Sequence, residues 1–168
     1  MNKLVLEQKE LFIVAISANE GTIIKIATFY TNTVDDKDDL IQEIIYQLWK
    51  SFDSFNQKSK LSTWIYQVAL NVAIYHLKIA KRKPRTVSME EQTFDMPETV
   101  SGDAEERWTV LRNQINDLNL LDRAIILLYL EDKSYEEIAE IVGISITNVG
   151  TKLSRIKEKL KKQTQKKL

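Results

Sequence analysis

The sequence predicts an all-α protein with two small helical domains joined by a flexible linker. Glycine and proline are scarce, with 4 and 2 among 168 residues, and apolar residues recur at helical spacing along the chain. Both prolines, Pro84 and Pro97, lie in a mostly acidic stretch that ends at Gly102 and lacks this periodicity. Such stretches are typical of interdomain linkers, so we expect domains over 1–83 and 104–168, with a flexible acidic linker over 84–103.

The first domain is predicted to contain four helices. Two span 4–18 and 20 to 31. A third follows a group of aspartates and runs to Ser51, and its predicted core face is Ile41, Ile44, Ile45, Leu48 and Phe52. The fourth runs from 61 to 81 and ends before Pro84, because a residue that precedes proline is disfavoured in a helix. Its predicted buried stripe is Leu61, Trp64, Ile65, Val68, Val72, Tyr75 and Ile79, with Thr63, Gln67, Asn71 and Lys78 on a polar face.

The second domain is predicted to have helices over 104–117 and 120–131, followed by a helix-turn-helix. Ser134 and Glu137 have the spacing of a capping box, and Gly143 suits the left-handed residue that ends a helix. Ser145 then caps a second helix, whose apolar stripe is Val149, Leu153, Ile156 and Leu160. Proteins use such a helix pair to enter the major groove of DNA, with the second helix reading bases.

Charge is unevenly distributed along a chain whose net charge is zero. Residues 90–106 are acidic, whereas the last helix is basic, with only Glu158 opposing Lys152, Arg155, Lys157, Lys159, Lys161, Lys162, Lys166 and Lys167. Neutralisation of phosphates by such a cluster is the main source of DNA affinity. DNA binding is therefore favoured over the alternative of an ordinary helical hairpin with a solvated polar face.

The composition argues against several other classes of protein. The chain has no cysteine, which suits a reducing compartment, and no apolar run of about 18 residues that would span a bilayer. His76 is the only histidine, and no glycine-rich phosphate loop occurs. The sequence thus predicts a cytoplasmic protein that is not an enzyme and has no catalytic residue, cofactor, metal site or small-molecule substrate. For the group Asp35, Asp36, Asp38 and Asp39, complementing the helix dipole is favoured over a metal site.

Two parts of the chain carry a family resemblance. Residues 38–50 (DDLIQEIIYQLWK), Phe55 and residues 62–73 (STWIYQVALNVA) resemble region 2 of bacterial RNA polymerase sigma factors of the extracytoplasmic-function type. Residues 127–145 (LLYLEDKSYEEIAEIVGIS) resemble the fourth conserved region of the same family. The resemblance covers nearly the whole chain, in the family's order and with its linker.

The resemblance implies a transcription initiation factor that binds core RNA polymerase and directs promoter-specific initiation. The implied partners are the β′ clamp and the β flap of the polymerase, promoter DNA, and an anti-sigma factor, which in this family is often membrane-bound. The residues that match the polymerase-binding surface are Asp39, Leu40, Gln42, Glu43, Tyr46, Gln47, Trp49 and Lys50. For Trp49, packing in the domain core is the alternative.

The resemblance also assigns DNA contacts to both domains. Those implied for the minus-ten element are Phe55, Asn56, Lys58, Ser59, Lys60, Trp64, Asn71, Lys78 and Arg82. Those implied for the minus-thirty-five element are Thr147, Asn148, Thr151, Lys152, Ser154, Arg155 and Lys157. Asn71 suits a base reader because its amide both donates and accepts hydrogen bonds. For Trp64, packing in the domain core is the alternative to base stacking. Gly150 stands at a position where relatives commonly have a basic residue that contacts DNA.

A second functional interpretation remains open at the level of sequence. A stand-alone helix-turn-helix regulator would bind duplex DNA as a symmetric dimer without polymerase. A helical interaction module with an incidental basic tail is a third alternative. Association with core polymerase separates the first interpretation from the other two.

Overall fold

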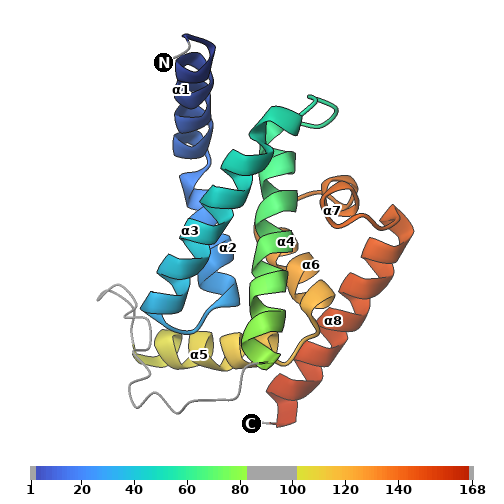
Figure 1. Cartoon of the computed structure of the whole chain (residues 1–168). Helices are drawn as coiled ribbons and strands as arrows, with labels where there is room; N and C mark the ends of the chain where they lie inside the picture. Colours follow the sequence, from blue (N-terminus) through green and yellow to red (C-terminus); the bar gives the residue numbers. More distant parts are fainter. Residues whose placement is uncertain (1–2, 83–101, 167–168) are drawn as a thin grey trace. The chain divides into compact units, whose positions relative to one another are not determined.

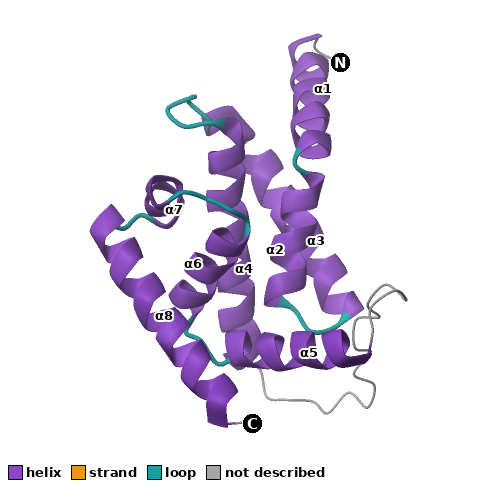
Figure 2. Cartoon of the chain, turned by 180° about the vertical axis from the view of Figure 1, so that it is seen from behind, coloured by secondary structure: helices purple, strands orange, loops and turns teal. Residues whose placement is uncertain are grey.

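The computed structural model describes residues 3–82 and 102–166, which form helices joined by short loops (Figure 1, Figure 2). In chain order the elements are α1 (Lys3–Ala18), α2 (Glu20–Tyr30), α3 (Val34–Ser51), the short 3-10 helix η1 (Phe52–Ser54), α4 (Leu61–Arg82), α5 (Gly102–Asn116), α6 (Leu120–Leu130), α7 (Tyr135–Val142) and α8 (Ile146–Lys166). No strand occurs among these residues, and the prediction of an all-α fold is confirmed.

The chain divides into two compact units, Met1–Phe94 and Asp95–Leu168, which we call unit 1 and unit 2. The division falls within the predicted linker over 84–103. Most of that linker lies outside the described residues, and α5 begins at Gly102, two residues before the predicted start of the second domain.

Unit 1 is built around α2, α3 and α4, which pack against one another. Its core consists of fully buried aliphatic side chains from the three helices: Ile23, Ile26, Ala27, Leu40, Ile44, Leu48, Ile65, Ala69 and Ala73. The first turn of α3 holds Asp35 and Asp36, and the Thr33 side chain accepts a hydrogen bond from the Asp36 backbone N–H at 3.1 Å. Carboxylates in this position complement the positive end of the helix dipole. These aspartates therefore have a structural role at the start of α3.

The core face of α3 differs from the prediction by a small rotation. Ile44 and Leu48 are fully buried as expected, but Leu40 is buried with them, and Ile41, Ile45 and Phe52 are half-buried. The exposed fraction of Leu40 is 0%, so its side chain lies in the core of unit 1 and not on the outer surface of α3, where the polymerase-binding assignment had placed it. A leucine one turn before Ile44 falls on the same side of the helix, where it fills the space between α3 and its neighbours.

The buried face of α4 also differs from the predicted stripe. Its buried side chains are Thr63, Ile65, Tyr66, Ala69, Leu70 and Ala73. Trp64, Val68 and Val72 are only half-buried, and Tyr75 is 66% exposed. Of the predicted stripe, therefore, only Ile65 is fully buried, and Thr63 was wrongly placed on the polar face. Apolar residues occur on both sides of α4, so helical spacing alone does not distinguish its two apolar faces.

Unit 2 is organised by α6, whose middle is buried almost entirely. Residues 123–128 are all buried, and α7 and α8 both pack against this helix. Arg123 is included because its guanidinium reaches the end of α5, where Nη2 donates to the Asn116 carbonyl oxygen at 2.7 Å. This hydrogen bond offsets part of the cost of burying the charge. The helix-turn-helix thus packs against a helix whose middle is almost entirely buried.

The turn between α7 and α8 has the predicted caps. The Ser134 hydroxyl accepts from the Glu137 backbone N–H at 3.1 Å, and the Glu137 carboxylate accepts from the Ser134 backbone N–H at 2.9 Å. Gly143 has φ 81° and ends α7 in the left-handed conformation that glycine adopts without steric cost. The Ser145 hydroxyl accepts from the Asn148 backbone N–H at 3.1 Å and opens α8. These contacts confirm the capping box, the glycine stop and the second cap.

Candidate nucleic-acid interface

The helix α8 has one apolar face and one exposed polar face. Val149, Leu153 and Ile156 are buried against the rest of unit 2. The side chains predicted to reach base edges or flanking phosphates are all exposed: Thr147, Asn148, Thr151, Ser154 and Arg155. Because the apolar face is anchored and the polar face is free, α8 is placed as a groove-entering helix requires.

The two lysines predicted to contact phosphates are held by α6 in the free protein. The ammonium of Lys152 lies 3.6 Å from Oδ1 of Asp122. The ammonium of Lys157 donates to the Tyr129 hydroxyl at 3.0 Å and lies 4.1 Å from the centroid of that ring. The hydrogen bond to Tyr129 raises the pKa of Lys157 above its ordinary value. Both lysines thus connect α8 to α6.

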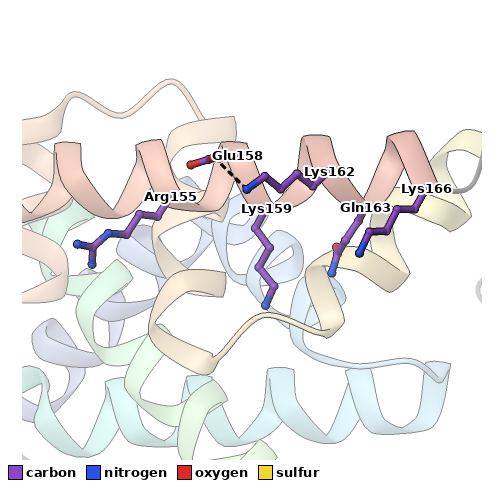
Figure 3. Close-up of a pocket in the computed structure, with 6 residues that line it drawn as sticks. All are labelled: Arg155, Glu158, Lys159, Lys162, Gln163 and Lys166. Atoms are coloured by element: carbon purple, nitrogen blue, oxygen red, sulfur yellow. Dashed lines mark ion pairs between the residues drawn. The ribbon is translucent and has the colours of Figure 1, made fainter.

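Positive charge continues along α8 beyond the predicted contacts. Figure 3 shows Arg155, Lys159 and Lys166 along a shallow hollow of about 360 Å³, and the described residues that line it all belong to α8. Lys162 also lines this hollow and pairs with Glu158 at 3.1 Å. Residues at these spacings lie on one side of a helix. The basic side of α8 is therefore continuous with the exposed side chains of its first turns.

Gly150 lies in α8 beside Tyr135, the first residue of α7. A Cβ atom at this position would lie 3.6 Å from Cε2 of Tyr135, which is an ordinary van der Waals contact. A longer side chain would have to extend past the tyrosine ring. At position 150, therefore, the chain has no basic side chain, and the ring of Tyr135 lies next to the glycine.

In unit 1 the outward side of α4 carries three exposed side chains at helical spacing. Asn71, Tyr75 and Lys78 are each exposed and follow one another by one turn. An amide, an aromatic ring and a cation are therefore presented together on a helix whose opposite side forms the core. The apolar pattern wrongly placed Tyr75 in the buried stripe, and its exposure makes it a further candidate on this face. Its spacing of four residues from Asn71 was the available signal.

The loop before α4 is attached to that helix by aromatic contacts. The ring centroid of Trp64 lies 5.2 Å from that of Phe55 and 6.3 Å from that of Phe52. Trp64 is half-buried, so it takes part in packing while keeping some exposed surface. Asn56, Lys58 and Lys60 are exposed and Ser59 is half-buried. The Asn56 side-chain oxygen accepts from the Lys58 backbone N–H at 3.1 Å, which orders the turn. The side chain of Arg82 lies outside the described residues.

The outer face of α3 is polar with two exposed aromatic rings. Asp39, Gln42, Glu43, Tyr46, Trp49 and Lys50 are exposed, and Gln47 is half-buried. The Gln47 amide donates to the Glu43 carboxylate at 3.2 Å. Trp49 is 37% exposed and its ring packs edge-on against Phe12 of α1, with centroids 5.0 Å apart. Trp49 thus packs on one side and remains available to a partner on the other.

Comparison with known proteins identifies the family. The Sigma-70 region 2 family matches residues 15–83, and the Sigma-70 region 4 family matches residues 109–160. The ECF RNA polymerase sigma factor SigW of Bacillus subtilis is 32% identical, over 77% of this chain and 76% of that protein. The chain belongs to the extracytoplasmic-function sigma factors.

Other relatives agree with this assignment. The ECF RNA polymerase sigma-E factor of Haemophilus influenzae is 27% identical, over 94% of this chain and 89% of that protein. Among solved structures, the sigma factor RpoE of Bartonella quintana, in complex with the anti-sigma factor NepR, has a TM-score of 0.69 at 22% identity and covers 94% of this chain and 96% of that one. That similarity shows the fold. This chain is thus a DNA-binding transcription initiation factor that acts with core RNA polymerase at promoters. The alternative of a stand-alone helix-turn-helix regulator is not supported.

Proposed function

We propose that the two units divide promoter recognition between them. The domain over 1–83, which lies in unit 1, docks on core polymerase and reads the melted minus-ten element, and the domain over 104–168, which lies in unit 2, docks the duplex minus-thirty-five element. The linker over 84–103 connects them. The observation that carries this proposal is the same in each unit: a packed helix presents an exposed amide outside its buried face, Asn71 in α4 and Asn148 in α8.

Polymerase docking is assigned to the outer face of α3. Tyr46 and Trp49 offer exposed aromatic area, and Asp39, Gln42, Glu43 and Lys50 offer polar groups around it. Aromatic residues with a polar rim are typical of protein interfaces. The partner on this face is the β′ clamp. Leu40 contributes indirectly, because its buried side chain packs in the core beneath the outer face of α3.

Capture of the minus-ten element is assigned to α4 and the loop before it. A base extruded from the duplex needs an aromatic or apolar surface and a polar group for its edge. Asn71 supplies the amide, and we add Tyr75 as a stacking surface one turn away. Lys58, Lys60 and Lys78 then hold backbone phosphates. Phe55 and Trp64 position the loop, and Trp64 keeps only part of its ring available to DNA.

Docking of the minus-thirty-five element is assigned to the exposed side of α8. Thr147, Asn148 and Thr151 lie on its first turns, where a recognition helix meets base edges. Arg155 and Ser154 follow toward the flanking backbone. Lys152 and Lys157 are less free, since each already has a partner on α6. In the bound state they exchange or share those partners with phosphates.

The proposal also includes a regulatory partner and a cellular location. The solved relative RpoE is bound to the anti-sigma factor NepR, which supports an anti-sigma partner for this chain, often membrane-bound in the family. The protein has no catalytic chemistry of its own and requires no cofactor. It acts in the bacterial cytoplasm, where core polymerase and promoter DNA are found. No single helix among the described residues has the length and apolarity to cross a membrane.

A reconstituted transcription assay tests the proposed function. Core polymerase from a bacterium that encodes this chain is mixed with genomic fragments, with and without the purified protein, and run-off transcripts are mapped. We expect defined start sites that appear only with the protein, and weak binding of the free protein to the same fragments. Initiation at the same positions by core polymerase alone would contradict the proposal.

A further inference from the structure

The acidic partner of Lys152 is held in place at the start of α6. Asn119 caps this helix: its side-chain oxygen accepts from the Asp122 backbone N–H at 2.8 Å, and its side-chain nitrogen donates to Oδ2 of Asp122 at 2.9 Å. The other carboxylate oxygen, Oδ1, lies 3.6 Å from the ammonium of Lys152. Asp122 therefore supports the helix cap with one oxygen and faces α8 with the other.

The Oδ1 atom of Asp122 relies on the charge of Lys152. This oxygen is shielded from solvent, and no hydrogen-bond donor among the described residues reaches it. At 3.6 Å the ammonium lies beyond ordinary hydrogen-bond length, so it compensates the oxygen by its charge alone. A shielded carboxylate oxygen without a counter-charge is costly. Movement of Lys152 toward a DNA phosphate would therefore leave Asp122 uncompensated.

Lys152 belongs to a row of polar side chains along one side of α8. Asn148, Lys152, Arg155 and Lys159 follow one another at spacings of three or four residues, so they share a side of the helix. Lys152 is half-buried and the other three are exposed. Among the described residues, no carboxylate pairs with Arg155 or Lys159. Lys152 is thus a cation with an opposed charge between an amide and an arginine that we assign to DNA.

The second lysine that contacts α6 is held by different chemistry. Tyr129 lies seven residues after Asp122 and hence on a similar side of α6, and its hydroxyl accepts from the Lys157 ammonium at 3.0 Å. A phenol hydroxyl accepts a hydrogen bond without opposing the charge of the donor. The helix α6 therefore orients Lys157 through a neutral group, whereas it opposes the charge of Lys152 with a carboxylate.

We propose that Asp122 is a positioning residue that limits the affinity of unit 2 for promoter DNA, because its carboxylate competes with a backbone phosphate for Lys152. This inference rests on the proposed function, since it requires α8 to dock the upstream element. Phosphate contacts carry no sequence information. Competition for Lys152 therefore lowers the sequence-independent part of the affinity, and it leaves the side chains that face base edges unaffected.

The test uses holoenzyme assembled from core polymerase and the full chain. The DNA is a promoter fragment that is mapped in the run-off assay and depends on the upstream element, and binding is followed by fluorescence anisotropy over a range of salt concentrations. Asp122→Asn removes the charge but keeps an oxygen that can accept from Asn119. We expect binding to tighten about threefold. The logarithmic salt slope should steepen by about 0.9, as for one further neutralised phosphate, which a merely structural role would not cause.

A double-mutant cycle with Lys152→Ala separates competition from simple repulsion of DNA by Asp122. In the Lys152→Ala background Asp122→Asn should tighten binding much less, because the ammonium for which the carboxylate competes is gone. Asp117→Asn makes the same change in net charge at an exposed residue and is the matched control. Tyr129→Phe removes the partner of Lys157 without changing the charge. Neither of these two variants should tighten binding.

A second substitution keeps the inference testable if Asp122→Asn lowers the melting temperature. Asp122→Ser is also uncharged, and its hydroxyl can accept from Asn119, so it should give the same tighter binding and steeper salt slope. Unchanged or weaker binding by the folded variants, an unchanged salt slope, or equal tightening in the Lys152→Ala background would overturn the inference. Failure of the wild-type holoenzyme to initiate would contradict the proposed function instead, so the two failures are distinguishable.

Discussion

The indole ring of Trp64 and the phenyl ring of Phe55 lie with their centroids 5.2 Å apart and their planes at 41°. Phe55 belongs to the segment before α4, and Trp64 lies in the first turn of that helix. The contact holds the start of the exposed loop against the helix that carries Asn71. The loop proposed to capture DNA is thereby attached to the core of unit 1 at its base.

Replacing Phe55 tests this attachment. Phe55→Ala removes one ring of the pair, and we expect the free energy of unfolding to fall by about 1 kcal/mol in urea titrations. Promoter opening should fall as well, because the loop loses its anchor. Phe29→Ala is the matched control, since Phe29 is another half-buried ring, with its centroid 6.1 Å from that of Tyr30. Equal loss of opening in both variants would show that general destabilisation is the cause.

Replacing Asn71 tests base reading. Asn71→Ala removes an exposed amide, and we expect promoter opening to fall severalfold while affinity for core polymerase is unchanged. Permanganate footprinting of unpaired thymines measures opening, and fluorescence anisotropy measures polymerase binding. Asn113→Ala, at an exposed asparagine of α5, should change neither quantity. Parallel loss of opening and polymerase binding in Asn71→Ala would point to misfolding.

Replacing Tyr75 tests base stacking, and two substitutions distinguish the contribution of its ring from that of its hydroxyl. Stacking of a base on an aromatic side chain contributes about 1–3 kcal/mol, so Tyr75→Ala should lower the open-complex equilibrium constant by about tenfold. Tyr75→Phe keeps the ring and should behave like the wild type. Because Tyr75 is 66% exposed, neither change should lower the melting temperature appreciably. Full activity of Tyr75→Ala would remove this residue from the proposed site.

Replacing Arg155 tests the upstream contact. Arg155→Ala should weaken use of promoters that depend on the minus-thirty-five element by about 1–3 kcal/mol in effective affinity, while core binding is unchanged. Lys161→Ala removes an exposed cation from a different side of α8 and is the control for net charge. Transcription from promoters with and without the upstream element measures the effect. The same loss in both variants would indicate a general charge effect.

Gly150 and Gly143 are expected to respond in opposite directions to alanine. In α8, Gly150→Ala improves helix propensity by about 1 kcal/mol, and the new Cβ meets Tyr135 at 3.6 Å without a clash. Its melting temperature should rise by a few degrees. Gly143→Ala places a Cβ at φ 81° and should lower the melting temperature. Thermal denaturation followed by circular dichroism measures both, and a lowered melting temperature for Gly150→Ala would contradict the packing described here.

Local signals identified the helix-turn-helix almost completely. Ser134 and Glu137, Gly143, and Ser145 act through backbone groups three or four residues away, so their spacing alone predicts where α7 begins and ends and where α8 begins. The exposed side of α8 followed from the same reasoning, because its apolar residues form a single stripe.

The buried face of α4 and the place of Leu40 were decided only by tertiary packing. Apolar residues lie on both sides of α4, and α2 and α3 cover the side with Ile65 and Ala69, which leaves Tyr75 outside. From the sequence alone we obtained helix boundaries, caps and a family resemblance, because these depend on neighbours in the chain or on motifs. Which apolar side chains meet depends on the neighbouring helices, since hydrophobic burial has no direction of its own.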